Sequence, residues 1–93
     1  GDIELIVGIN LQKEITGVEI LSIDETVGLG MNAKNEEFRN QYVGKKVDHF
    51  QVVKNGKQNE DEVDSLSGAT ITSKAMTNGI NGALDFYDLL KGR

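Results

Sequence analysis

The fold is decided by the stretch MTNGINGALDFYDLL, residues 76–90. Its apolar residues recur at steps of three and four, the spacing that places side chains on one face of an α-helix. The residues of this face are Met76, Ile80, Ala83, Leu84, Tyr87 and Leu90. Gly79 and Gly82 interrupt the helix at a cost of up to about 1 kcal/mol each relative to alanine. We therefore expect a long C-terminal helix whose glycines allow close approach to a sheet or to a bound ring.

Two runs near the start of the chain have the alternation of β-strands. Ile3, Leu5, Val7 and Ile9 share one face of the first run, and residues 15–23 form the second. Because only a short polar connection at residues 12–14 separates them, the two runs are expected to pair as a hairpin.

A short helix is expected in the middle of the chain. Asn35 is typical of an N-cap, and Phe38 and Tyr42 lie four residues apart, so they would share one helical face. Gly44 is expected to end this helix.

The remaining segments predict one more strand. Residues 50–53 have strand character, Asn55-Gly56 indicates a turn, and residues 57–62 are expected to form a polar, acidic loop. Together these patterns predict an α+β domain: a small, mainly antiparallel sheet packed against a long C-terminal helix, with one short additional helix.

Length and composition restrict the function. The 93 residues suffice for one domain, and 10 basic against 15 acidic residues give a formal charge of −5, which disfavours a nucleic-acid partner. The absence of cysteine excludes disulfides, thiolate catalysis and thiolate metal sites. No run is long and apolar enough for a spanning helix. We expect the chain to be a domain excised from a longer protein.

A run of small and hydroxyl residues, SGATITS at residues 67–73, lies where the long helix should begin. A helix N-terminus offers unpaired N–H groups and a partial positive charge, and small residues let a phosphate come close. Lys74 could add a point charge. A well-capped helix start accounts for the same residues without a ligand, so the residues alone leave both interpretations open.

The longer run DSLSGATITSKA, residues 64–75, resembles the flavinylation motif of a family of FMN-binding domains. The family includes the G subunit of Rnf-type electron-transport complexes and the C subunit of the sodium-translocating NADH:quinone reductase. A second block, ETVGLG at residues 25–30, is similar to the family's Glu-Thr-Pro-Gly-Leu-Gly loop, with Val27 in place of the usual proline. The resemblance covers nearly the whole chain.

The resemblance implies that Thr70 carries FMN through a phosphoester, installed by a dedicated Mg²⁺-dependent flavin transferase. Asp64 opens the motif and would be read by that transferase. The residues expected around the phosphate are Ser67, Gly68, Ala69, Thr72 and Lys74. Those expected at the flavin ring or ribityl chain are Glu25, Thr26, Gly28 and Leu29. Neither a catalytic residue nor a metal site is expected.

Other candidates have simpler interpretations. His49, the single histidine, lies on an expected strand and has no nucleophile in its sequence context, which favours a surface or structural role. The acidic residues 60–64 lack the alternating ligands and central glycine of a calcium loop and are typical of a solvated turn. Glu25 is expected to hydrogen-bond beside the flavin and not to act as a general acid. The aromatic residues at helical spacing, expected to pack in the core, are Phe38, Tyr42, Phe86 and Tyr87.

The resemblance implies an electron-transfer domain of a membrane-anchored parent protein, in a complex that couples electron flow between ferredoxin and NAD⁺ to ion movement. Other subunits of the complex and the flavin transferase are the expected partners, and the extracytoplasmic side of a cell membrane is the location that the resemblance implies. The alternative is a non-redox binding or interaction module that uses the helix start at residues 67–70 for a phosphorylated small molecule.

Overall fold

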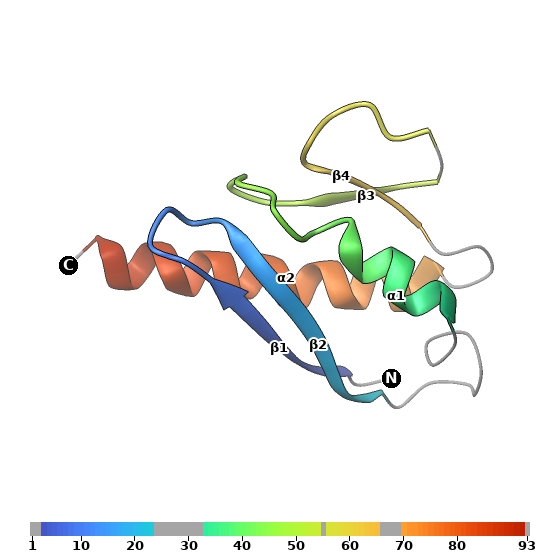
Figure 1. Ribbon diagram of the computed structural model, residues 1–93, viewed down its shortest axis with the longest axis horizontal. Coiled ribbons are helices and arrows are strands. Elements are labelled where there is room, and N and C mark those ends of the chain that lie inside the picture. The colour runs from blue at the N-terminus through green and yellow to red at the C-terminus, as the bar shows by residue number, and fades with distance from the viewer. Residues whose placement is uncertain (1–2, 24–32, 55, 66–69, 93) are drawn as a thin grey trace.

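The computed structural model describes residues 3–23, 33–54, 56–65 and 70–92. Along the chain the elements follow in the order β1, β2, α1, β3, β4 and α2 (Figure 1). Two strand pairs and two helices make an α+β domain, so the expected fold class is confirmed. Within the described ranges, neither helix combines the length and the apolar character needed to cross a bilayer.

The first two strands form the expected hairpin. β1 (Ile3–Ile9) pairs antiparallel with β2 (Ile15–Ile23). The side-chain oxygen of Asn10 accepts hydrogen bonds from the backbone N–H groups of Gln12 and Glu14 at 2.9 and 3.0 Å, which fixes the turn. Two register shifts occur along the pair, between Glu4 and Leu5 and between Gly8 and Ile9. Each shift marks a bulge, where β2 gains one residue relative to β1.

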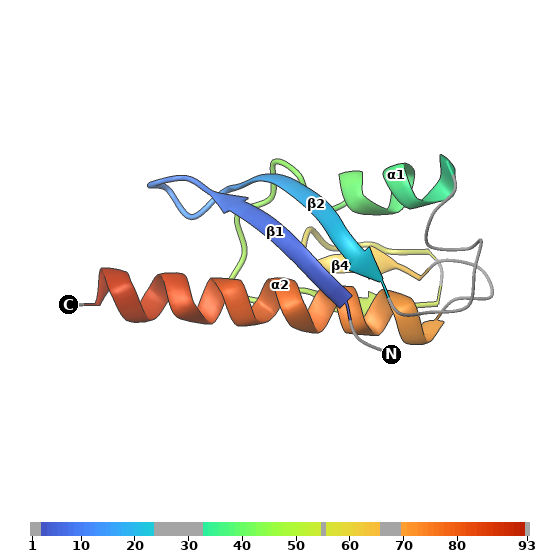
Figure 2. The ribbon, with the colours of Figure 1, turned by 90° about the horizontal axis from the view of Figure 1, so that it is seen from below.

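The longest element is α2 (Thr70–Lys91), and the hairpin crosses it diagonally (Figures 1 and 2). Met76, Ile80 and Leu84 are fully buried, which confirms the core of the expected stripe. Leu90 and Phe86 are 58% and 60% exposed, so the expectation that they pack inside was wrong. The C-terminal end of the helix projects past the hairpin (Figure 2).

The two glycines of α2 differ in their surroundings. A Cβ on Gly79 would come within 3.6 Å of the Leu5 side chain, an ordinary van der Waals contact with the sheet. A Cβ on Gly82 would meet no described atom within 4 Å. The sheet therefore does not require glycine at either position.

The short helix α1 (Ala33–Asn40) begins two residues before Asn35. Asn35 therefore lies in the first turn, and its expected role as N-cap was wrong. The helix ends at Asn40, and a turn follows to Gly44, which has a φ of 82°. Gly44 thus ends this turn and not the helix itself.

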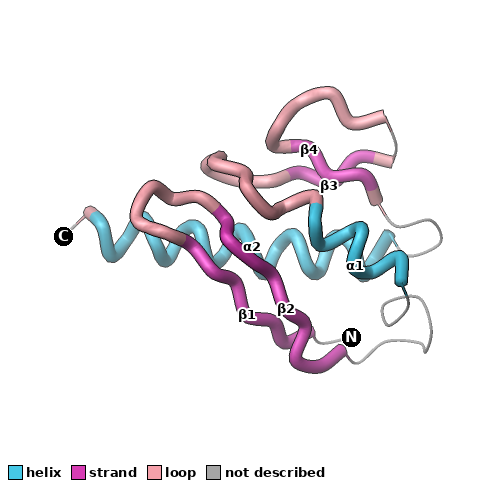
Figure 3. Tube along the Cα trace, viewed as in Figure 1, coloured by secondary structure: helices cyan, strands magenta, loops and turns pink. Residues whose placement is uncertain are grey.

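The second strand pair differs from the expected sheet. β3 (Gln51–Val53) lies beside β4 (Glu62–Asp64) (Figure 3), and the two strands pair in parallel. Residue 62 therefore begins a strand, whereas a loop was expected over residues 57–62. Val63 is fully buried, but the acidic residues on both sides of it concealed this strand in the sequence. Gly56 has a φ of 72°, in agreement with the expected turn.

An aromatic group joins the layers of the core. The rings of Phe38 and Tyr42 meet edge to face at 5.6 Å, and those of Tyr42 and Phe50 at 5.0 Å. All three side chains are buried, which confirms the packing role expected for the first two. The Tyr42 hydroxyl lies 2.6 Å from Thr77 Oγ1 of α2, and its burial raises the pKa of Tyr42. The phenol therefore stays protonated and can donate to the threonine.

Candidate functional site

The N-terminus of α2 places Thr70 at the surface. Thr70 is the first residue of a 22-residue helix, and its side chain is exposed. The first turn contains no acidic residue, so the partial positive charge of the helix start is not neutralised from within that turn. Ser65 Oγ donates a long hydrogen bond to Thr70 Oγ1 at 3.4 Å. An exposed hydroxyl thus lies at the helix end that favours an anion.

The other described residues of the predicted phosphate site separate into two groups. Lys74 is exposed, as Thr70 is, and can reach a ligand at the surface. Thr72 is only 6% exposed, and its neighbour Ser73 is fully buried. The side chain of Thr72 is therefore buried, and a contact between Thr72 and a phosphate stays a prediction.

Asp64 lies at the end of β4, immediately before Ser65. Its Oδ1 accepts a hydrogen bond from the backbone N–H of Lys57 at 3.0 Å, so the carboxylate closes the loop between β3 and β4. The side chain of Gln41 also binds the Asp64 backbone. It accepts a hydrogen bond from Asp64 N at 2.8 Å and donates one to Asp64 O at 3.0 Å. Sequence reasoning missed Gln41, because a polar residue between Phe38 and Tyr42 gives no signal of its partner.

The remaining predicted contacts lie outside the described residues. They are Glu25, Thr26, Gly28 and Leu29 of the second block and Ser67, Gly68 and Ala69 of the motif.

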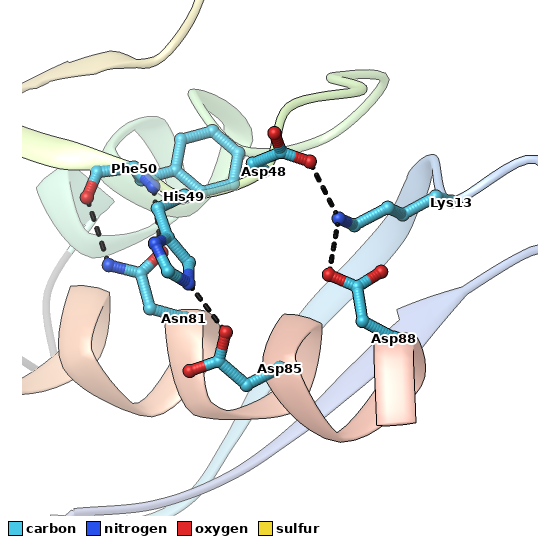
Figure 4. Close-up of polar contacts among 7 residues, drawn as sticks. All are labelled: Lys13, Asp48, His49, Phe50, Asn81, Asp85 and Asp88. Carbon is cyan, nitrogen blue, oxygen red and sulfur yellow. Dashed lines mark hydrogen bonds and ion pairs between the residues drawn. The ribbon is translucent and has the colours of Figure 1, made fainter. Parts of the chain in front are cut away.

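A separate polar group connects α2, at Asn81, Asp85 and Asp88, to the preceding loops (Figure 4). His49 Nε2 lies 2.6 Å from Asp85 Oδ1, so the histidine has the surface role expected for it. It precedes β3, however, and its expected place on a strand was wrong. Lys13 Nζ donates to both Asp48 and Asp88, at 2.9 and 2.8 Å. These hydrogen bonds, first of all the one to Asp88, raise the pKa of Lys13.

The acidic stretch stabilises its own turn. Glu62 Oε1 accepts hydrogen bonds from the backbone N–H groups of Gln58 and Asn59 at 2.8 and 3.2 Å, which lower the pKa of Glu62. Across the part of the chain that the structure describes, no three metal-ligating side chains gather into a group that could hold an ion. A shallow hollow beside this turn is lined by Val47, Asp48, His49 and residues 58–61. It contains none of the predicted site residues.

Comparison with known proteins connects this geometry to a family. Residues 1–85 match the family described as FMN-binding domain. The G subunit of the proton-translocating ferredoxin:NAD(+) oxidoreductase complex of Clostridium ljungdahlii is 42% identical over 85 residues, which cover 91% of this chain and 45% of the relative. The G subunit of the Na(+)-translocating ferredoxin:NAD(+) oxidoreductase complex of Acetobacterium woodii is 36% identical over 92 residues, which cover 97% of this chain and 44% of the relative.

A relative from a second complex matches less of the chain. The C subunit of the Na(+)-translocating NADH-quinone reductase of Vibrio parahaemolyticus is 40% identical over 81 residues, which cover 78% of this chain and 30% of the relative. The chain thus spans less than half the length of each of these relatives.

Proposed function

The chain belongs to the FMN-binding domain family, and on that premise we propose that it is an electron-carrier domain with FMN attached to Thr70. The linkage would be a phosphoester on Thr70 Oγ1. The observation that carries this proposal is the exposed hydroxyl of Thr70 on the first residue of a 22-residue helix. FMN supplies one- and two-electron redox chemistry, and the domain would pass those electrons to neighbouring subunits.

The first turn of α2 fits a phosphoester. A phosphate ester keeps a negative charge, and the unpaired N–H groups of a helix start stabilise such a charge. Since residues 70–73 contain no carboxylate, nothing in this turn repels it. Lys74 is exposed one residue later and can add a positive charge. Ser67, Gly68 and Ala69 are the further phosphate contacts that the motif predicts.

Attachment requires an activated flavin nucleotide, in which the FMN phosphate is part of a phosphoanhydride. The Thr70 oxygen forms the new bond to phosphorus, the anhydride bond breaks, the second nucleotide leaves, and the hydroxyl proton is released to a base. A flavin transferase would supply this donor nucleotide. Asp64 would form part of the segment that this enzyme reads.

The relatives named above support a larger assembly. We propose that the parent protein is the G subunit of a membrane complex that couples ferredoxin:NAD⁺ oxidoreduction to ion translocation. The domain would lie on the extracytoplasmic side and exchange electrons with other subunits. By itself it would carry electrons without converting a substrate.

Coexpression of the chain with a flavin transferase of this family tests the attachment. We expect the intact mass to rise by one FMN less one water, with the added mass on the peptide that contains Thr70. Thr70→Ala should abolish the addition. Thr16→Ala, which removes another exposed threonine hydroxyl on β2, should leave it unchanged. An unmodified wild-type chain, in cells where the relative from C. ljungdahlii is modified, would refute the proposal.

A further inference from the structure

The β3–β4 pair has two outer edges, because no third strand joins it within the described residues. Ser65 N donates to Val53 O, and Gln51 N donates to Asp61 O, both at 2.8 Å. Successive residues of a strand direct their backbone groups to opposite edges. The N–H and C=O of Asp64 and of Phe50, each one residue away, therefore face outward.

At each of these two residues, a side-chain amide hydrogen-bonds both the N–H and the C=O that face outward. Asp64 N donates to Gln41 Oε1 at 2.8 Å, and Gln41 Nε2 donates to Asp64 O at 3.0 Å. On the other edge, Phe50 N donates to Asn81 Oδ1 at 2.7 Å, and Asn81 Nδ2 donates to Phe50 O at 2.9 Å (Figure 4). Each amide takes the place that a residue of a third strand would occupy. A two-stranded parallel pair is short of stabilising contacts, and these amides supply them.

The two amides differ in what they hold. Asn81 fixes the residue before β3, next to the surface histidine. Gln41 fixes the last residue of β4, and the next residue, Ser65, donates to Thr70 Oγ1. Ser65 is also bound to β3 through its backbone N–H. Gln41 therefore holds the end of β4 in place. The next residue, Ser65, is the one that contacts the Thr70 hydroxyl.

We propose that Gln41 is a positioning residue for flavin attachment at Thr70. This inference rests on the proposed function. Transfer to a hydroxyl requires the oxygen to approach phosphorus in line with the leaving group, so a fixed orientation of Thr70 raises the rate. Gln41 keeps Asp64 and Ser65 in place, and Ser65 orients the threonine. Gln41 itself does not contact the reacting atoms.

The test uses the 93-residue chain as the protein substrate of a flavin transferase of this family, with FMN incorporation followed by intact mass. Gln41→Ala should lower the kcat of incorporation at least about tenfold, since small displacements of a reacting group have effects of this size. The KM for the chain should change little. Asn81→Ala is the matched control, because it removes the same pair of hydrogen bonds from the other edge. Its kcat should stay within about twofold of wild type, as expected for a remote site.

A second variant separates positioning from folding. Gln41→Glu keeps the size and the acceptor for Asp64 N–H but loses the donor, so its rate should lie between those of wild type and Gln41→Ala. Hydrogen exchange should accelerate at the Asp64 amide in Gln41→Ala and not in Asn81→Ala. If Asn81→Ala slowed incorporation as much as Gln41→Ala, or if only KM changed, the positioning role would be overturned. If the wild-type chain itself took up no FMN, the proposed function would be the idea at fault.

Discussion

Two unequal parts of α2, residues 70–84 and residues 85–91, are held by different forces, and we call them its first and second half. Its six buried residues all lie between positions 72 and 84, and three of them are fully buried apolar side chains. Beyond Leu84 the apolar side chains of Phe86, Leu89 and Leu90 are 53% to 60% exposed. This second half contacts the rest of the domain through polar side chains, namely Asp85, Tyr87 and Asp88.

This difference in burial shows which half of α2 contributes more to the stability of the domain. Full burial of a large apolar side chain stabilises a fold by about 1.5–3 kcal/mol, whereas an exposed ion pair contributes about 0–1 kcal/mol. Most of the stability that α2 provides therefore comes from the half that begins at Thr70. A functional group is positioned well only when the element beneath it is fixed by packing. Thr70, the proposed attachment residue, thus lies on the better-anchored half of the helix.

Shortening one apolar side chain in each half of α2 should give the largest difference in the free energy of unfolding. Ile80→Ala leaves a cavity in the core and should lower the free energy of unfolding by about 2–5 kcal/mol. Leu90→Ala, at the exposed end, should change it by no more than about 0.5 kcal/mol. Urea denaturation of both variants measures the difference, with the m-value as the check for two-state unfolding. Equal losses would mean that the end of the helix is buried by a contact absent from this structure.

Removing one phenol hydroxyl at each half of α2 should give an intermediate difference in stability. Tyr42 contacts the first half, and Tyr87 belongs to the second. Tyr42→Phe leaves Thr77 Oγ1 buried without its 2.6 Å partner, at an expected cost of about 1–3 kcal/mol. Tyr87 donates to the Leu11 carbonyl at 2.8 Å in an exposed setting where water can replace it, so Tyr87→Phe should cost less than about 1 kcal/mol.

A double variant identifies the cause of the Tyr42 effect. Tyr42→Phe combined with Thr77→Val removes both buried polar groups, so it should be less destabilised than the sum of the single variants. Additive losses would contradict the assignment of the cost to the unpaired hydroxyl.

Periodicity predicted the fold where an element is long. The hairpin and α2 have enough residues for an alternating or a helical pattern to emerge, and both were found as expected. β4 has three residues, with one buried valine between two acidic residues, and so carries no readable pattern. Helical spacing also continues past the point where burial stops, which is why Phe86 and Leu90 were misplaced. Periodicity identifies a face of the helix, but the length of the covering hairpin decides how much of that face is buried.

The candidate site was only partly readable from the sequence. The resemblance of the motif singled out Thr70, which the structure places exposed at the start of α2, and its attachment role stays a prediction. Gln41 and Asn81 could not be found in this way, because each binds a backbone group 23 or 31 residues away. Such contacts depend on the register of the strand pair, and side-chain type alone does not reveal that register.

The smallest expected effect on stability concerns the ion pairs of the second half of α2. Asp88→Asn removes one of the two carboxylates that Lys13 contacts, and the exposed position limits the expected loss at neutral pH to about 0.2–1 kcal/mol. Because Lys13 has a raised pKa in the folded state, its contribution is complete below the ordinary lysine pKa and is lost as the pH rises through the raised value. The difference between wild type and Asp88→Asn should therefore be constant near pH 7 and vanish once the pH exceeds the raised pKa of Lys13. Urea denaturation over this pH range measures it, and 1 M salt should reduce it at neutral pH. A difference that persisted at high pH and high salt would show that Asp88 stabilises the helix end by packing instead of charge.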